Sequence, residues 1–254
     1  MSPGTALVTG PTTGIGRAFA EALASRGHDL VLVARDGRRL EELAEHLRGE
    51  HAVDVEVLAA DLAEREEIAR VEARLADVDR PISMLVNNAG FGHKLPFAEN
   101  SVEDEQEMLD VLVTAVLRLT HAAVGPMLAR GEGTVVNVSS VAAFLPRGTY
   151  SAAKRYVVSF SEWLDLTYRD RGVRGMAVCP GFVRTEFHER MGVGRDSAPA
   201  WMWLDADRVV RDALHDLVRG RTVSVPSKRY KVLAALAQYT PSSLQARFQG
   251  LGRR

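Results

Sequence analysis

Short apolar runs alternate with longer stretches of helical spacing along most of this chain. The apolar runs are rich in Val and Leu and occupy residues 6–8, 30–33, 53–59, 82–86, 134–138, 175–178 and 222–225. The stretches with helical spacing occupy residues 14–26, 37–49, 64–77, 104–129, 150–171 and 205–219. This alternation predicts a parallel sheet with right-handed crossovers, and continuous Val/Leu runs indicate strands buried on both faces. We therefore expect an α/β fold with a doubly wound parallel sheet of about seven strands, flanked by helices on both faces.

Length and composition favour a single soluble domain. The chain has 254 residues, of which 46% are hydrophobic, and contains no internal repeat or linker that would divide it. We expect one domain over residues 1–254. With 32 basic and 33 acidic residues, the charge gives no sign of a nucleic-acid partner. A single cysteine, Cys179, and no recognisable leader or apolar run near 18 residues predict a cytoplasmic location.

A glycine-rich segment lies between the first apolar run and the first helical stretch. It reads Thr9-Gly10-Pro11-Thr12-Thr13-Gly14-Ile15-Gly16. Gly10 would allow a sharp turn, and Gly14 and Gly16 would let backbone N–H groups and a helix N-terminus approach a pyrophosphate. A purely structural turn is the alternative, but the position between strand and helix favours dinucleotide binding.

The end of the second strand indicates which dinucleotide is used. An acidic residue there would bind the ribose 2′-hydroxyl, whereas this chain has Ala34-Arg35, and arginine suits a 2′-phosphate. NADP(H) is therefore favoured, with NAD(H) as the alternative. Arg17 either adds positive charge or is solvated. Asp61-Leu62, after the third strand, would contact the adenine edge, unless Asp61 caps the helix that begins near residue 63.

Tyr150 and Lys154 are four residues apart at the start of a predicted helix, on one helix face. The lysine charge would favour the phenolate and lower the tyrosine pKa, so that Tyr150 acts as a general acid or base. The spacing alone is also compatible with a helix turn that carries a solvated lysine.

Together, these motifs resemble those of the short-chain dehydrogenase/reductase family, in particular its NADP-dependent carbonyl and 3-oxoacyl reductases. They agree in order and approximate spacing over residues 4–225, and comprise Thr9 to Gly16, Asn87-Asn88-Ala89-Gly90, Ser140, Tyr150 with Lys154, and Pro180-Gly181. The resemblance implies a Rossmann-type fold, a nicotinamide cofactor and hydride transfer to or from a carbonyl or alcohol carbon.

The resemblance also implies catalytic roles. Tyr150 would exchange a proton with the substrate oxygen, and Lys154 would lower the Tyr150 pKa and bind the nicotinamide ribose. Ser140 would hold and polarise the substrate carbonyl. We expect no metal ion. The expected cofactor-binding residues, besides Tyr150 and Lys154, are Gly10, Thr12, Thr13, Gly14, Ile15, Gly16, Arg35, Asp61, Leu62, Asn88 (nearest the cofactor), Ala89, Gly90, Pro180, Gly181, Val183 and Thr185.

Two features depart from the family pattern. Leu112 stands where the family usually has an asparagine that holds a water beside the lysine, and a leucine cannot hold that water. In addition, nine residues separate Ser140 from Tyr150, about three fewer than usual, which leaves Ser139 as a fallback for the serine role. These departures support an alternative function, a dinucleotide-binding sensor or scaffold with weak or lost turnover.

The substrate would be held by less regular segments. Residues 186–204 include Phe187, Trp201 and Trp203, and we expect them to form a lid over a hydrophobic carbonyl or alcohol substrate. The alternative is that the tryptophans pack internally or contact another subunit. His93 either edges the pocket or is structural or solvated.

The C-terminal extension, residues 226–254, is basic, lacks Asp and Glu and contains an apolar stretch at 232–237. This pattern predicts a helix that covers the substrate cleft or a subunit interface, or else contact with a membrane surface or an acyl carrier. The family resemblance also implies a homodimer or homotetramer assembled through its fourth and fifth helices.

Overall fold

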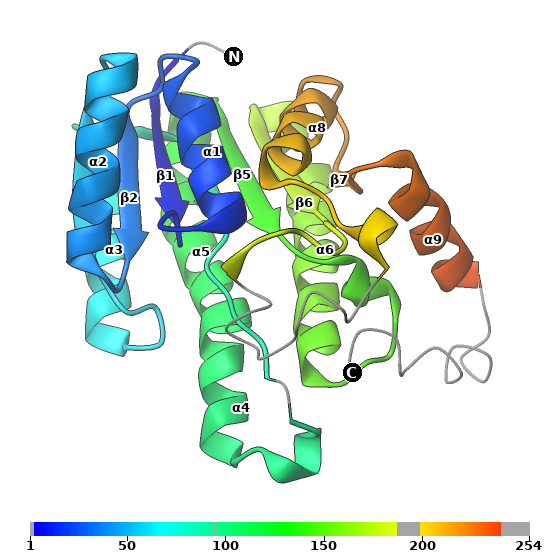
Figure 1. The fold of residues 1–254 in the computed structure, drawn as a ribbon. Helices are drawn as coiled ribbons and strands as arrows, with labels where there is room; N and C mark the ends of the chain where they lie inside the picture. Colours follow the sequence, from blue (N-terminus) through cyan, green and yellow to red (C-terminus); the bar gives the residue numbers. More distant parts are fainter. Residues whose placement is uncertain (1–2, 94, 187–198, 240–254) are drawn as a thin grey trace.

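The computed structural model describes residues 3–93, 95–186 and 199–239. These residues form a seven-stranded, all-parallel sheet in the order β3-β2-β1-β4-β5-β6-β7 (Figure 1). The strands are β1 Thr5–Thr9, β2 Leu30–Ala34, β3 Val55–Ala59, β4 Ile82–Asn87, β5 Gly133–Val138, β6 Val173–Val178 and β7 Val223–Ser224. The predicted doubly wound sheet is confirmed. The last strand is shorter than expected, because only Val223 and Ser224 pair with β6.

The helices agree with the predicted stretches to within a few residues. The longer ones are α1 Gly14–Ala24, α2 Gly37–His51, α3 Arg65–Ala76, α4 Val102–Leu109, α5 Ala115–Arg130, α6 Thr149–Tyr168, α8 Ala206–Val218 and α9 Lys228–Tyr239. The short turns are the 3-10 helices η1 Phe97–Glu99, η3 Val141–Phe144, η4 Arg169–Arg171 and η6 Ala200–Met202, and the π-helix η2 Asp110–Thr114. The expected C-terminal helix is α9, whereas residues 240–254 of the basic extension lie outside the described part.

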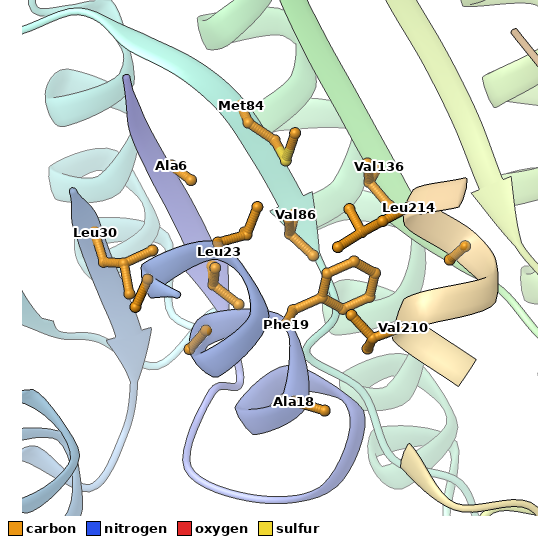
Figure 2. Close-up of a cluster of buried hydrophobic side chains, with 14 of the residues drawn as sticks. Ala6, Ala18, Phe19, Leu23, Leu30, Met84, Val86, Val136, Val210 and Leu214 are labelled. Carbon is orange, nitrogen blue, oxygen red and sulfur yellow. The ribbon is translucent and has the colours of Figure 1, made fainter. Parts of the chain in front are cut away.

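Two apolar cores lie on opposite faces of the sheet. On one face, α1, α2 and α8 pack against the strands, and Phe19 of α1 meets Val210 and Leu214 of α8 (Figure 2). On the other face, side chains of α3 and α5 meet the strands around Leu85 and Val135. The central strands are buried on both sides, as their continuous Val/Leu runs predicted.

The predicted helix at 104–129 is longer and is not uniformly α-helical. It runs through α4, η2 and α5, and a π-turn at Asp110–Thr114 interrupts it. The segment Val102–Arg130 is long and apolar enough to cross a membrane by length and composition, with a mean hydropathy of 1.6 in an 18-residue window. Here α5 packs against α3, β4 and β5 as a core helix.

Strand order reverses between β1 and β4, since β2 lies on one side of β1 and β4 on the other. Crossovers that leave β1 and β4 therefore run to opposite sides and open a crevice at the carboxyl ends of these strands. The glycine-rich segment at 10–16 and the turn at 88–90 both lie at this edge, so the fold brings two sequence motifs to one site.

Candidate active site

A cavity of about 920 Å³ lies along the carboxyl edge of the sheet. Its wall contains nearly all the described residues that were expected to bind cofactor or substrate. Those that line it are Gly10, Thr12, Thr13, Gly14, Ile15, Arg35, Asp61, Leu62, Asn88, Ala89, Gly90, His93, Ser140, Tyr150, Lys154, Pro180, Gly181, Val183 and Thr185. Residues separated by more than 170 positions therefore share one wall.

Gly16 is the exception within the glycine loop, because it packs behind the cavity. A Cβ at this position would lie 2.1 Å from the Gly10 carbonyl oxygen and 2.4 Å from the Asn88 side-chain nitrogen. Gly16 does not line the cavity, and its expected contact with the cofactor stays a prediction. Its role is to let helix α1 approach the end of β1 closely.

Asn88 lines the cavity, but its side chain is used to shape the glycine loop. Its Nδ2 donates to the carbonyl oxygens of Thr9 (2.9 Å) and Gly10 (3.0 Å). The Thr9 hydroxyl in turn accepts hydrogen bonds from the N–H groups of Asn88 and Ala89. These bonds tie the ends of β1 and β4 together and fix the turn that begins at Gly10.

The N-terminus of α1 has neither a side-chain cap nor an acidic residue in its own first turn. Thr13 occupies the N-cap position with extended backbone but makes no side-chain cap hydrogen bond, and the first turn contains no acidic residue. The first N–H groups of a helix lack intrahelical acceptors and carry partial positive charge. This helix end therefore suits a phosphate group in the cavity.

Two arginines line the cavity beyond the end of β2. Arg35 lies 3.5 Å from Asp61, and Arg39, which the sequence analysis missed, lies 3.6 Å from Asp36. Asp36 also accepts the N–H of Arg39 as the N-cap of α2. The Asp36 carboxylate is thereby engaged with its own helix, and Arg39 Nη1 also lies 3.5 Å from Glu186 Oε2. Arg35 and Arg39 thus supply guanidinium groups at this end of the cavity, each with a carboxylate nearby.

Asp61 is not the cap of the next helix. Helix α3 begins at Arg65 with Glu64 at its N-cap position, and Asp61 Oδ1 instead accepts the N–H of Ala63 at 3.0 Å. The alternative role as a helix cap near residue 63 is therefore wrong in register. Asp61 forms a local turn at the cavity wall.

Ser140 and Tyr150 are brought together by the short connection between them. After β5, Ser140 caps the 3-10 turn η3 and accepts the Ala142 N–H at 3.1 Å. Helix α6 then begins at Thr149, and the two side chains are hydrogen-bonded. The shortened gap thus leaves the pair intact.

Ser139 cannot take the place of Ser140 in this arrangement. It is buried, and its hydroxyl donates to the Lys154 carbonyl oxygen at 2.7 Å. Its hydroxyl is committed to anchoring helix α6 against β5. The fallback assignment to Ser139 is therefore not supported.

The expected lowering of the Tyr150 pKa by Lys154 is not found. Burial of the phenol raises the pKa of Tyr150 to about 12, although the side-chain hydrogen bond with Ser140 acts in the opposite direction. Burial also lowers the pKa of Lys154 to about 8. The Lys154 Nζ lies 5.8 Å from the Tyr150 ring centroid, and burial is the largest cause of both pKa shifts.

Leu112 closes the space beside the lysine with hydrocarbon. It is fully buried within the π-turn and packs with Met108 and Ala153. A Cβ at Gly90 would lie 2.7 Å from Leu112 Cδ2 and 3.7 Å from Lys154 Nζ, so both side chains flank Gly90. Leu112 therefore places an apolar side chain on this side of Lys154, at the position where the family usually has an asparagine.

The substrate end of the cavity differs from expectation at the tryptophans. Trp201 is 57% exposed, and Trp203 is buried with its ring 5.5 Å from that of Phe182. Neither lines the cavity, so their assignment to the pocket wall is corrected. Phe182 lines the cavity with Trp203 packed on it. Phe187, the third expected aromatic residue, lies outside the described residues, as does most of the predicted lid.

His93 does line the cavity, and its Nε2 lies 2.9 Å from the Asp104 carbonyl oxygen. His93 therefore lies at the pocket, as one alternative expected, and also makes a structural contact, as the other expected. Other lining residues were missed by the sequence analysis because they belong to no motif. They include Phe91, Val141, Leu145, Arg147 and Phe182.

Comparison with known proteins agrees with this geometry. The model of a family described as short chain dehydrogenase matches residues 4–195. A very-long-chain 3-oxoacyl-CoA reductase of Anas platyrhynchos is 34% identical over 189 residues, which are 71% of this chain and 60% of that protein. This chain thus spans less than two thirds of that relative's length.

Two solved structures are similar over nearly the whole chain. A short-chain dehydrogenase from Sphingobium yanoikuyae in complex with NADPH is 37% identical, with a TM-score of 0.86 over 92% of this chain and 93% of that one. A bulky-bulky ketone specific alcohol dehydrogenase from Comamonas testosteroni is 33% identical, with a TM-score of 0.81 over 94% and 93% of the two chains.

Proposed function

Because this chain belongs to the short-chain dehydrogenase family, we propose that it is an NADP(H)-dependent oxidoreductase that interconverts a carbonyl and an alcohol on a hydrophobic substrate. The observation that carries the proposal is the hydrogen-bonded pair of Ser140 and Tyr150 on the wall of a dinucleotide-sized cavity, with Lys154 beneath it. A hydroxyl pair at a cavity wall can hold a carbonyl oxygen and exchange a proton with it.

The residues at the other end of the cavity fit a phosphorylated dinucleotide. The uncapped N-terminus of α1 would hold the pyrophosphate, and Arg35 and Arg39 would bind a ribose 2′-phosphate. The solved structure of the Sphingobium yanoikuyae relative is a complex with NADPH, which supports this choice of cofactor. When bound, the nicotinamide supplies or accepts the hydride.

The protein's own groups manage the proton. With a pKa near 12, Tyr150 keeps its proton at neutral pH and is ready to donate it to a carbonyl oxygen in the reductive direction. Ser140 would share that oxygen and orient it. Lys154, held by the Val138 carbonyl oxygen, would place a positive charge beneath Tyr150.

The substrate class follows from the lining at the catalytic end. Phe91, Val141, Leu145 and Phe182 give this end an apolar wall, which favours a bulky ketone or an acyl chain over a small polar substrate. The descriptions of two relatives agree with this substrate class, since one is a very-long-chain 3-oxoacyl-CoA reductase and the other is a bulky-bulky ketone specific alcohol dehydrogenase. A sensor or scaffold without turnover is not favoured, because the serine–tyrosine pair is intact.

We further propose that the protein forms a homo-oligomer through α5 and α6. Leu117 of α5 is 45% exposed, and Trp163 and Leu166 of α6 are 50% and 82% exposed. Large apolar side chains exposed on adjacent helices are typical of subunit interfaces. Sedimentation velocity tests this, and a monomer at micromolar concentration would contradict it. Cytoplasmic location and contact of the basic C-terminus with a membrane or an acyl carrier stay predictions.

The test of the main proposal is NADPH oxidation with a panel of ketones that includes 3-oxoacyl thioesters. Tyr150→Phe should reduce the turnover of any active ketone by about 100-fold or more. Tyr156→Phe is a matched control, because Tyr156 stacks on Phe160 of the same helix and does not line the cavity. Equal turnover in the Tyr150 variant and the parent would refute the proposed role.

A further inference from the structure

The C-terminal helix α9 contacts the segment at the catalytic end of the cavity through the side chain of Tyr230. This tyrosine is only 2% exposed. Its hydroxyl accepts a hydrogen bond from the Phe182 N–H at 3.0 Å and donates one to the Met202 carbonyl oxygen at 2.8 Å. Burial raises the pKa of Tyr230, so the hydroxyl retains the proton that it donates. One phenol therefore joins two segments that are 20 residues apart.

The Tyr230 ring lies directly against Gly181. A Cβ at position 181 would come within 1.9 Å of the ring carbon Cζ and 2.2 Å of Cε1. Only a residue without a side chain allows this contact. Because Gly181 and Phe182 line the cavity, the ring supports the cavity wall from behind.

The two segments joined by Tyr230 also pair with each other. Val183 forms a parallel bridge with Leu204, in which the Leu204 N–H donates to the Phe182 carbonyl oxygen at 2.8 Å. The Arg184 N–H donates to the Leu204 carbonyl oxygen at 2.9 Å. Tyr230 closes the end of this bridge, so its loss would free the backbone from Gly181 to Val183 on one side.

We propose that Tyr230 is a positioning residue that holds the turn at 180–183 in place for the nicotinamide end of the cofactor. This inference rests on the proposed function, in which Pro180, Gly181 and Val183 flank the nicotinamide. Tyr230 does not line the cavity and acts through Gly181 and Phe182. The adenosine end, formed by the glycine loop and by Arg35 and Arg39, lies outside its contacts.

The test compares two ligands that share the adenosine end. NADPH carries the nicotinamide, and adenosine 2′,5′-bisphosphate does not. Tyr230→Phe keeps the ring and removes both hydrogen bonds, so the Phe182 N–H and the Met202 carbonyl lose their partner. We expect NADPH affinity, measured by calorimetry, to fall by about tenfold, and that of the bisphosphate to change by less than about twofold.

A purely structural role for Tyr230 predicts a different pattern. Leu75→Ala, on the buried face of α3 and away from the cavity, serves as the control for general loss of stability. It should lower the Tm and leave the ratio of the two affinities unchanged. Tyr156→Phe controls for loss of a tyrosine hydroxyl and should change neither affinity.

Gly181→Ala provides a second perturbation of the same contact, because its new Cβ displaces the Tyr230 ring while the hydroxyl remains. It should also weaken NADPH more than the bisphosphate. Parallel weakening of both ligands by Tyr230→Phe, or no change in either, would overturn the positioning role. Failure of the parent protein to bind NADPH would overturn the proposed function itself, and the role of Tyr230 with it.

Discussion

The Nζ of Lys154 donates a 2.8 Å hydrogen bond to the carbonyl oxygen of Val138, the last residue of β5. The lysine is 5% exposed, and its carbonyl partner is neutral. A buried ammonium held by a neutral dipole retains much of its desolvation cost. Placing a positive charge beneath Tyr150 therefore costs the folded protein stability, which is typical of groups that serve function.

This cost predicts how stability depends on pH. The pKa of Lys154 falls from 10.5 to about 8 on folding, so the unfolded chain binds more protons between these values. Stability should therefore rise as pH increases from 8 towards 10.5. Lys154→Met removes the charge and should stabilise the protein by up to about 3 kcal/mol near pH 7. Urea unfolding of both proteins near pH 7 and near pH 10 checks this, and a difference that did not shrink at high pH would contradict it.

Leu112 is expected to resist replacement by asparagine. Its packing neighbours Met108 and Ala153 are apolar, so Leu112→Asn should lower the free energy of unfolding by about 2 kcal/mol unless the new amide bonds to the Lys154 ammonium, which also flanks Gly90. Leu112→Met keeps the volume and should cost less than about 1.5 kcal/mol. Chemical denaturation compares the two. An asparagine variant as stable as the parent would show that this site already accommodates polarity or water.

The arginines at the adenosine end should determine the preference for NADPH. Removing both charges in a double variant, Arg35→Ala with Arg39→Ala, should weaken NADPH by about 10- to 100-fold, because charge-assisted bonds to the phosphate are lost. Affinity for NADH should change far less. Titration with both cofactors measures the ratio, and Arg171→Ala, outside the cavity lining, serves as the control. Equal losses for NADPH and NADH would refute recognition of the 2′-phosphate.

Asp165 should be essential for stability at neutral pH. Its fully buried carboxylate accepts hydrogen bonds from Arg174 (2.9 Å), Thr222 (2.7 Å) and the Gly175 N–H (3.1 Å), and pairs with Arg169. Burial alone would raise the pKa of Asp165, but these partners hold it below 3.8. Its stabilisation is therefore present above pH 3.8 and is lost as pH falls through the folded pKa.

Asp165→Asn should cost about 1 to 3 kcal/mol near pH 7, because the partly exposed Arg169 and Arg174 lose their counterion. The difference from the parent should narrow below about pH 4. Thermal unfolding across this pH range provides the measurement. A constant difference at all pH values would mean that the loss comes from packing rather than from charge.

Local sequence was sufficient where a residue's role depends on its neighbours along the chain. The Val/Leu runs gave the strands because burial on both faces requires apolar residues at every position. The glycine loop and the Tyr150–Lys154 pair could be predicted in the same way. The first depends on consecutive residues of one turn, and the second on residues one helical turn apart. Each of these motifs does reach the cavity wall, with Gly16 behind it.

Roles that depend on distant segments could not be predicted in this way. Arg39 and Phe182 belong to no motif, and Trp201 and Trp203 were placed at the cavity although one is exposed and the other packs behind Phe182. Tyr230 lies 49 residues beyond Gly181, and no periodic signal connects them. Such contacts follow only from how helices close over the end of the sheet.

The pKa of Tyr150 likewise separates what the sequence determines from what the tertiary structure determines. The sequence by itself determined that a tyrosine and a lysine share a helix face, and the family resemblance of its motifs identified Ser140 as the partner of the tyrosine. Only the tertiary structure decided that both groups are buried, which raises the pKa of Tyr150 and lowers that of Lys154. Desolvation depends on every segment that surrounds a group, whereas spacing along one helix depends on that helix alone.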